Sequence, residues 1–106
     1  MIVYVDDLQD WGGRGFWKGK PSCHLLAVDL SPEAELALHE LAQRIGMRRS
    51  WAQLPPKASW PHYDLVSSRR VAAVRAGAIE ISSRAAAKLR RAIRRQLAET
   101  VGSGFS

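Results

Sequence analysis

Histidine and aspartate side chains recur along this sequence in patterns that suit a polar site. The most concentrated group is the segment 62–65, His-Tyr-Asp-Leu, where an imidazole, a phenol and a carboxylate stand close together. Asp6 and Asp7 follow an apolar run near the start of the chain. Adjacent side chains of a strand point to opposite faces, so we expect one of these two carboxylates to face a site. The alternative is that they cap a turn or a helix.

The three histidines, His24, His39 and His62, do not have the spacing that places two metal ligands on one helix face. Folding must therefore assemble any site that they share. His62 and Asp64 suit metal ligation, a proton relay or the orientation of a phosphate. The alternatives are local: Asp64 caps the following helix, Tyr63 packs against its neighbours, and His39 makes a structural hydrogen bond at the border of an apolar helix face.

Basic side chains stand near these groups. Arg69 and Arg70 fall in the first turns of a predicted helix, where guanidinium and backbone N–H groups bind phosphate well. Exposure to solvent, or an ion pair with Glu80, is the alternative for either arginine. Both arginines belong to a basic half of the chain: residues 1–46 carry a net charge of −3 and residues 47–106 one of +9. This asymmetry indicates an anionic partner or a solvated basic helix.

The segment 11–20, Trp-Gly-Gly-Arg-Gly-Phe-Trp-Lys-Gly-Lys, mixes aromatic, glycine and basic residues. Aromatic rings such as that of Trp17 can stack on bases while Arg14 meets a phosphate. The Gly-Lys-Ser/Thr ending of a Walker loop is absent. The alternative is an Ω-type loop that folds its tryptophans onto the core.

The bulk properties predict one small domain in a reducing compartment. A chain of 106 residues suffices for a single core, and its only cysteine excludes an internal disulfide, so we expect a cytoplasmic protein. No segment has the roughly 18 apolar residues of a membrane span. Acidic residues follow the first apolar run too soon for a signal peptide, so we expect neither membrane insertion nor export.

The local patterns predict strands that alternate with helices. We expect strands at 2–5, 24–28, 49–53 and 78–81, and helices at 32–45, 68–76 and 84–98, with a long loop at 11–21 and a further loop around 62–64. In the second helix Ser67 or Ser68 is the predicted cap, and Val71 and Val74 are predicted to be buried. The fold class is therefore α/β: one small domain with a short, mostly parallel sheet packed by about three helices. Residues 1–84 would form its core, and residues 85–106 a basic helix and a flexible tail.

The order of these features resembles a family of short bacterial and phage proteins known as domain of unknown function 4031. The matching pieces, between residue 2 and about residue 84, are Val3-Tyr4-Val5-Asp6-Asp7, the Trp-Gly loop, His24-Leu25, the segments 38–42, 45–46, 51–53 and 62–65, Arg70, and the segment 77–82. Ala52 stands where the family often has an aromatic residue. The resemblance implies a cytoplasmic, often phage or prophage, setting and no particular activity. The polar positions that it implies are Asp6, Asp7, His24, His39, His62, Tyr63, Asp64 and Arg70.

Three functions are compatible with these residues. The first is binding of a phosphate-bearing ligand, nucleic acid or nucleotide, through His24, His39, His62, Tyr63, Asp64, Arg69, Arg70, Arg14 and Trp17. The second is a metal-dependent hydrolase or nuclease that holds one or two divalent ions through Asp6, Asp7, His24, His62 and Asp64. The third is a phage-encoded inhibitor that contacts a host protein, with the four tryptophans as anchors.

Overall fold

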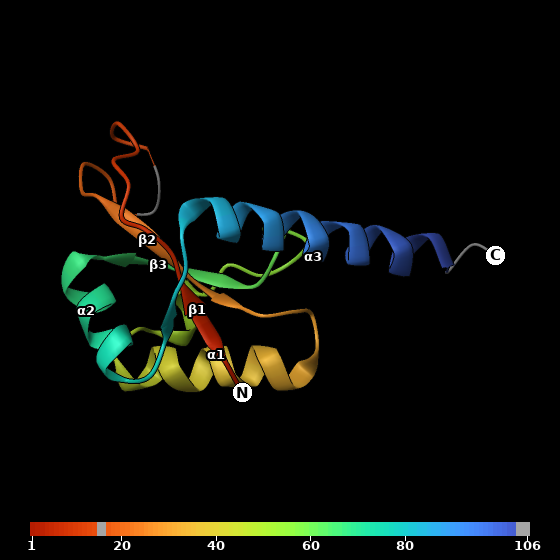
Figure 1. Cartoon of the computed structure of the whole chain (residues 1–106), viewed down its shortest axis with the longest axis horizontal. Helices are drawn as coiled ribbons and strands as arrows, with labels where there is room; N and C mark the ends of the chain where they lie inside the picture. Colours follow the sequence, from red (N-terminus) through yellow and green to blue (C-terminus); the bar gives the residue numbers. More distant parts are fainter. Residues whose placement is uncertain (15–16, 104–106) are drawn as a thin grey trace.

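The chain forms one four-stranded sheet with helices on both of its faces (Figure 1). A computed structural model describes residues 1–14 and 17–103 of the chain. The elements, in order, are β1 (Val3–Val5), β2 (Ser22–Ala27), α1 (Pro32–Arg44), the 3₁₀ helix η1 (Arg49–Trp51), β3 (His62–Val66), α2 (Ser67–Arg75), β4 (Ile79–Glu80) and α3 (Ser83–Ser103). The α/β class expected from the sequence is confirmed.

The sheet is mixed, and the expectation of a mostly parallel sheet is wrong. Its strand order is β3-β2-β1-β4, with β1–β2 and β2–β3 antiparallel and only β1–β4 parallel. For β1 and β2 the physical reason lies in their connection, whose described residues form no helix. Parallel neighbours need a crossover connection, usually a helix, whereas a chain that turns back through a loop pairs antiparallel.

The two faces of the sheet are covered by different helices. Figure 1 shows α1 and α2 on one face and α3 on the other, with α3 continuing beyond the edge of the sheet. Strand β2 serves both faces because its side chains alternate. Leu25 packs in the core cluster with Leu38 of α1, whereas Leu26 packs in a second cluster with Trp60 and with Ile93 of α3. We call these the α1 face and the α3 face.

Helix α1 has the ends that its sequence predicts. The Ser31 side chain accepts a hydrogen bond from the backbone N–H of Ala34 at 3.1 Å, and Pro32 follows in the first turn. Gly46 ends the helix region with a φ of +83°, which a side chain rarely tolerates. A Cβ atom there would lie 2.8 Å from Nη1 of Arg69, which donates to the carbonyl of Ile45. The backbone conformation thus favours glycine here, and a side chain would also displace the guanidinium of Arg69.

Two predicted segments differ from the structure. The strand expected at 49–53 is instead η1, followed by an isolated bridge between Gln53 and His62. The loop expected around His62 is instead strand β3. Its alternation of polar His62 and Asp64 with buried Tyr63 and Leu65 is the period of two that marks a strand with two different faces. The same strand excludes the alternative in which Asp64 caps a helix.

The remaining helices depart from expectation in detail. Val66 is the N-cap of α2 and no serine side chain caps it, while Val71 is 52% exposed rather than buried, because Ala73 faces the sheet instead. Helix α3 continues to Ser103, past the expected end at residue 98. Its exposed side carries Arg84, Lys88, Arg91 and Arg95. Part of the predicted flexible tail (104–106) and part of the 11–21 loop (15–16) lie outside the described residues.

Candidate metal centre

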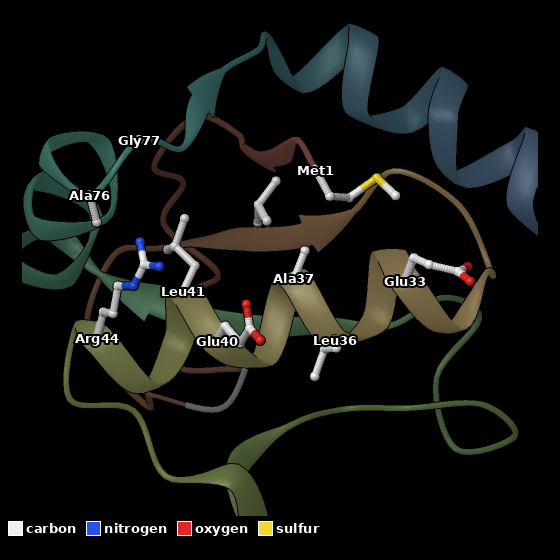
Figure 2. Close-up of a pocket in the computed structure, with 10 residues that line it drawn as sticks. Met1, Glu33, Leu36, Ala37, Glu40, Leu41, Arg44, Ala76 and Gly77 are labelled. Carbon is white, nitrogen blue, oxygen red and sulfur yellow. The ribbon is translucent and has the colours of Figure 1, made fainter.

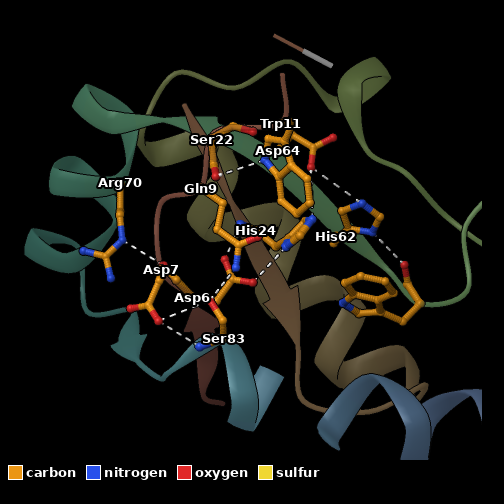
Figure 3. A network of polar contacts seen from close by, with 11 residues as sticks. Asp6, Asp7, Gln9, Trp11, Ser22, His24, His62, Asp64, Arg70 and Ser83 are labelled. Carbon is orange, nitrogen blue, oxygen red and sulfur yellow. Dashed lines mark hydrogen bonds and ion pairs between the residues drawn. The ribbon is translucent and has the colours of Figure 1, made fainter. Parts of the chain in front are cut away.

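Strands β2 and β3 place three potential metal ligands on the α3 face. His24 of β2 lies opposite Asp64 of β3, and Leu26 lies opposite His62. Residues two apart on a strand share a face, so His62 and Asp64 project together toward His24. Figure 3 shows the three side chains turned toward one another, although 38 positions separate His24 from His62 in the sequence.

The ligand atoms of these side chains have the separations expected around a single ion. Oδ1 of Asp64 lies 3.6 Å from Nε2 of His24 and 3.8 Å from Nε2 of His62. One ligand atom from each residue lies within 4.8 Å of the other two. Two ligands about 2.1 Å from a tetrahedral ion are about 3.4 Å apart. The distances are too long for direct hydrogen bonds and close to those across a coordination sphere.

The two histidine ligands are each oriented by a further contact on the far side of the ring (Figure 3). Nδ1 of His24 lies 2.8 Å from Oδ2 of Asp6, whose Oδ1 accepts from the backbone N–H of His24 at 2.6 Å. Nδ1 of His62 lies 2.9 Å from the carbonyl oxygen of Trp60. In the neutral form of each ring, these acceptors favour a proton on Nδ1 and a free lone pair on Nε2, which is the tautomer that metal ligation requires.

The third ligand, Asp64, is held in the same way. The side-chain amide of Gln53 donates to its Oδ2, which leaves Oδ1 directed at the two imidazoles. The isolated bridge between Gln53 and His62 positions that amide. Ligands fixed by a second layer of contacts are typical of metal sites in proteins.

Burial favours the ligating form of His62. Its side chain is 7% exposed, and desolvation lowers the pKa of its imidazole, an effect opposed by the hydrogen bond to the Trp60 carbonyl and by the charge of Asp64. A lowered pKa keeps the ring neutral near pH 7, so that Nε2 can bind a cation. The side chains of His24 and Asp64, 16% and 13% exposed, open the cluster to solvent.

Two cavities adjoin the cluster and share the same walls. The larger, of 370 Å³, is lined by His24, His62 and Asp64. The smaller, of 180 Å³, is lined by Asp6 and His24. Both cavities are bordered by Trp11, Trp60 and Arg90, and the larger one also by Lys57. The ligand atoms therefore face a space that suits a small polar molecule beside cationic and aromatic groups.

A larger cavity lies elsewhere and lacks such a cluster. Figure 2 shows this space of 410 Å³ beside α1, at the link between α2 and β4. Its charged lining consists of Glu33, Glu40 and Arg44, all on the exposed side of α1. The grouping of ligand atoms seen at His24 does not include them. Volume alone thus does not identify a site in this protein.

Asp7, Arg69 and Arg70 have structural contacts away from the ligand atoms. Oδ2 of Asp7 accepts from the backbone N–H of Ser83 at 2.9 Å, so it caps the start of α3. Arg69 donates to the carbonyl of Ile45 at 2.7 Å. Arg70 donates to the backbone carbonyl of Asp6 at 2.8 Å and pairs with Glu80 at 2.9 Å. The contacts of Asp7 and Arg70 match the local alternatives considered for them, a cap and an ion pair with Glu80, whereas the contact of Arg69 with a backbone carbonyl was not among its alternatives.

His39 and Tyr63 meet on the opposite side of the sheet. Nδ1 of His39 lies 2.7 Å from the Tyr63 hydroxyl, and its Nε2 lies 3.6 Å from Oε2 of Glu35. Burial lowers the pKa of His39 and raises that of Tyr63. Arg49 joins these two in lining a separate cavity of 250 Å³. The structure therefore divides the predicted ligand-binding residues between two faces.

The aromatic loop after β1 folds back onto the body of the protein. Nε1 of Trp17 donates to the backbone carbonyl of Asp64 at 2.8 Å, and its ring packs against the cluster of the α1 face. Trp11 donates to the carbonyl of Ser22 and lies with its ring 5.8 Å from that of His24. Arg14 is exposed, and its side chain donates to the carbonyl of Trp11 in the same loop.

Sequence reasoning missed several residues that form this region: Gln53, Lys57, Trp60, Arg90 and the wall position of Trp11. The available signal was the alternation in 62–66, which identifies β3 and the shared face of His62 and Asp64. No sequence pattern indicated Arg90, because it reaches the site from a helix whose orientation on the sheet depends on tertiary packing.

Comparison with known proteins identifies the family. Residues 3–93 match the family described as "Protein of unknown function (DUF4031)", so the chain belongs to it. No curated protein and no solved structure gives a significant match. Among the described residues, no helix has both the length and the apolar character needed to cross a membrane. The match extends into α3 and includes Arg90.

Proposed function

We propose that this member of the DUF4031 family is a metal-dependent hydrolase that binds one divalent transition-metal ion. The ligands are Nε2 of His24, Nε2 of His62 and Oδ1 of Asp64. One observation carries the proposal: three ligand atoms lie within 4.8 Å of one another, and each residue is fixed from behind by a separate contact. Imidazole and carboxylate ligands together suit Zn²⁺, which we take as the ion to test first.

The ligand set favours catalysis over a purely structural ion. Structural zinc sites are closed by four protein ligands, whereas catalytic sites use three and leave a position for water. Here three ligands face a cavity of 370 Å³, which leaves space for water and a substrate. A bound ion would lower the pKa of such a water and polarise the bond to be cleaved. The water oxygen adds to the electrophilic centre, the bond to the leaving group breaks, and that group departs with its electron pair and takes up a proton.

Asp6 serves this centre as a positioning residue and not as a ligand. Both of its carboxylate oxygens are engaged by His24, one by the ring and one by the backbone N–H. It fixes the ring and favours a proton on Nδ1, as carboxylates behind zinc-bound histidines do. Asp7 caps the start of α3 and is not directed at this centre, so the described residues support one ion rather than two.

Two features of the fold bear on the rival functions. All four tryptophans are buried or half-buried, so none offers a fully exposed ring as an anchor for a host protein. Arg69 and Arg70 already have acceptors, so they do not supply the free cationic groups that the phosphate-binding hypothesis assigned to them. The geometry therefore supports the hydrolase best.

The test is zinc binding and hydrolysis by purified protein from which metal has been removed by a chelator. We expect one Zn²⁺ per chain, and His24→Gln and Asp64→Asn to weaken its affinity by at least about 100-fold. His39→Gln is the matched control, because His39 is similarly buried but lies on the other face. Zinc should also accelerate cleavage of chromogenic carboxylic and phosphate esters.

Absence of zinc binding, or an equal loss in His39→Gln, would contradict the assigned centre. Stoichiometric zinc without cleavage of any ester would contradict the hydrolase assignment and leave a metal-binding protein.

A further inference from the structure

Arg90 borders the candidate centre, and no hydrogen bond or ion pair of its guanidinium is found among the described residues. It extends from α3 and lines both cavities that adjoin His24. Its Nε atom is enclosed and has no hydrogen-bond partner among the described residues, and no ion pair of Arg90 is found within them. A buried donor without an acceptor is costly, so such groups are normally satisfied by water or by a ligand.

Aromatic stacking holds this cation in position. The guanidinium carbon of Arg90 lies 5.1 Å from the ring centroid of Trp60, within the range of a cation–π contact. The Trp60 ring in turn stacks on the His62 ring, with centroids 4.4 Å apart and planes inclined by 21°. The Trp60 ring therefore lies between Arg90 and the candidate ligand His62. This contact does not neutralise the charge of Arg90.

Arg69 and Arg70 have structural contacts that Arg90 does not share. Arg69 and Arg70 each donate to a backbone carbonyl, and Arg70 also pairs with Glu80. Their donors are therefore used within the fold. No such acceptor of Arg90 is found in the part of the chain that the structure describes, and its planar guanidinium suits an oxyanion with two or more oxygens.

We infer that the substrate of the proposed hydrolase is a phosphate ester whose phosphoryl oxygens are held by Arg90; this rests on the proposed function. Lys57 lines the larger cavity as a second cation, so a guanidinium and an ammonium border the space that the proposed ion would face. A phosphoryl group has enough oxygens to meet all three, whereas a carboxylate has two. In the reaction the water oxygen bonds to phosphorus, the ester P–O bond breaks, and the alcohol leaves with the proton.

The experiment measures binding of inorganic phosphate to the zinc-loaded protein by calorimetry. We expect Arg90→Gln to weaken phosphate binding by at least about tenfold and to leave zinc affinity unchanged, because Arg90 is not a ligand. Arg94→Gln is the matched control: it removes the same charge from an exposed position one turn along α3. Arg90→Lys, which keeps the charge and loses the planar group, should give an intermediate affinity.

The outcomes separate this inference from the proposal on which it depends. Phosphate affinity in Arg90→Gln equal to that of the native protein, with zinc still bound, would overturn the anion site alone. Acetate that binds as tightly as phosphate and depends equally on Arg90 would overturn the choice of phosphate. Failure of the native protein to bind zinc would instead remove the hydrolase. Unchanged zinc affinity in each variant also shows that the fold is intact.

Discussion

The two faces of the sheet differ in how they treat polar side chains. On the α1 face, fully buried Leu25, Leu38 and Leu65 form a closed apolar layer, and the polar pair His39–Tyr63 is joined by a hydrogen bond at its edge. On the α3 face, His24, His62 and Asp64 stand where the apolar layer stops, and their ligand atoms are not hydrogen-bonded to one another. One face stabilises the fold, and the other leaves binding capacity open.

This difference arises within a single strand. In β3, Tyr63 and Leu65 enter the closed layer while His62 and Asp64 reach the cavity. The same five residues thus serve stability with one set of alternate positions and the candidate chemistry with the other. Substitutions at adjacent positions of this strand should therefore differ in effect: one position should affect the stability of the fold, and the next should affect the binding of an ion.

The strongest test of this difference substitutes two neighbouring residues of β3, one on each face of the sheet, in separate variants. Leu65→Ala should lower the free energy of unfolding by about 2–5 kcal/mol, because a fully buried leucine is replaced by a cavity. Asp64→Asn should cost under about 1 kcal/mol in the metal-free protein, because the site is partly open to solvent. Urea unfolding monitored by tryptophan fluorescence measures both. A larger loss of stability in Asp64→Asn than in Leu65→Ala would show that the polar cluster, and not the apolar layer, holds the sheet together.

The next test separates Asp6 from Asp7. Asp6→Asn should weaken zinc binding by about 10–100-fold, since an amide facing Nδ1 of His24 favours the tautomer with its proton on Nε2. Asp7→Asn should leave zinc affinity unchanged and cost about 0.5–1 kcal/mol of stability by weakening the cap of α3. Calorimetric titration with Zn²⁺ and thermal unfolding distinguish the two. Equal zinc affinities in the two variants would refute the orienting role of Asp6.

The smallest expected effect is the contribution of His39, on the α1 face, to the pH dependence of the free energy of unfolding. Burial, followed by the charge of Arg49, lowers the pKa of His39 below its ordinary value of 6.5. Below pH 6.5 the unfolded chain therefore takes up a proton before the folded protein does. The free energy of unfolding should fall as the pH drops from 6.5 toward the folded pKa, and the contribution of His39 is fully present above 6.5.

His39→Gln removes this proton uptake, so the metal-free variant should lose less stability on acidification than the native protein. Urea midpoints at about pH 8 and about pH 5.5 measure the difference. Part of the slope should remain in the variant, because burial also lowers the pKa of His62. Identical pH dependence in the two proteins would mean that His39 is not kept neutral by the fold.

The sequence predicted the parts of this protein that local chemistry determines. The ends of α1 followed from Ser31-Pro32 and Gly46, and the α/β class followed from the order of the elements. Strand order was not predictable in this way, since pairing of β1 with β4 joins residues about 75 positions apart, a separation that no local pattern reports. Strand β3 was missed because its polar positions were interpreted as a loop.

The candidate site was likewise predictable only in the chemistry of its residues and not in their arrangement. His24, His62 and Asp64 were among the predicted metal ligands because their side chains have the right chemistry. Their convergence depends on the pairing of β2 with β3, which the sequence alone did not reveal. Arg69 and Arg70 were assigned to the ligand because they begin a helix, whereas Arg90 from the middle of α3 borders the cavities. Which basic residue has no acceptor among the described residues depends on tertiary packing.

The alignment of β3 against β2 has a consequence for how an ion would be received. A register shift of one residue would turn Tyr63 and Leu65 toward the cavity and bury the side chains of His62 and Asp64 in the apolar core. Burial of these polar groups would be costly, so the apolar layer fixes the register. The donor atoms are therefore held in place before any cation arrives. Binding then requires little ordering of the chain, and the empty protein should fold as fully as the loaded one.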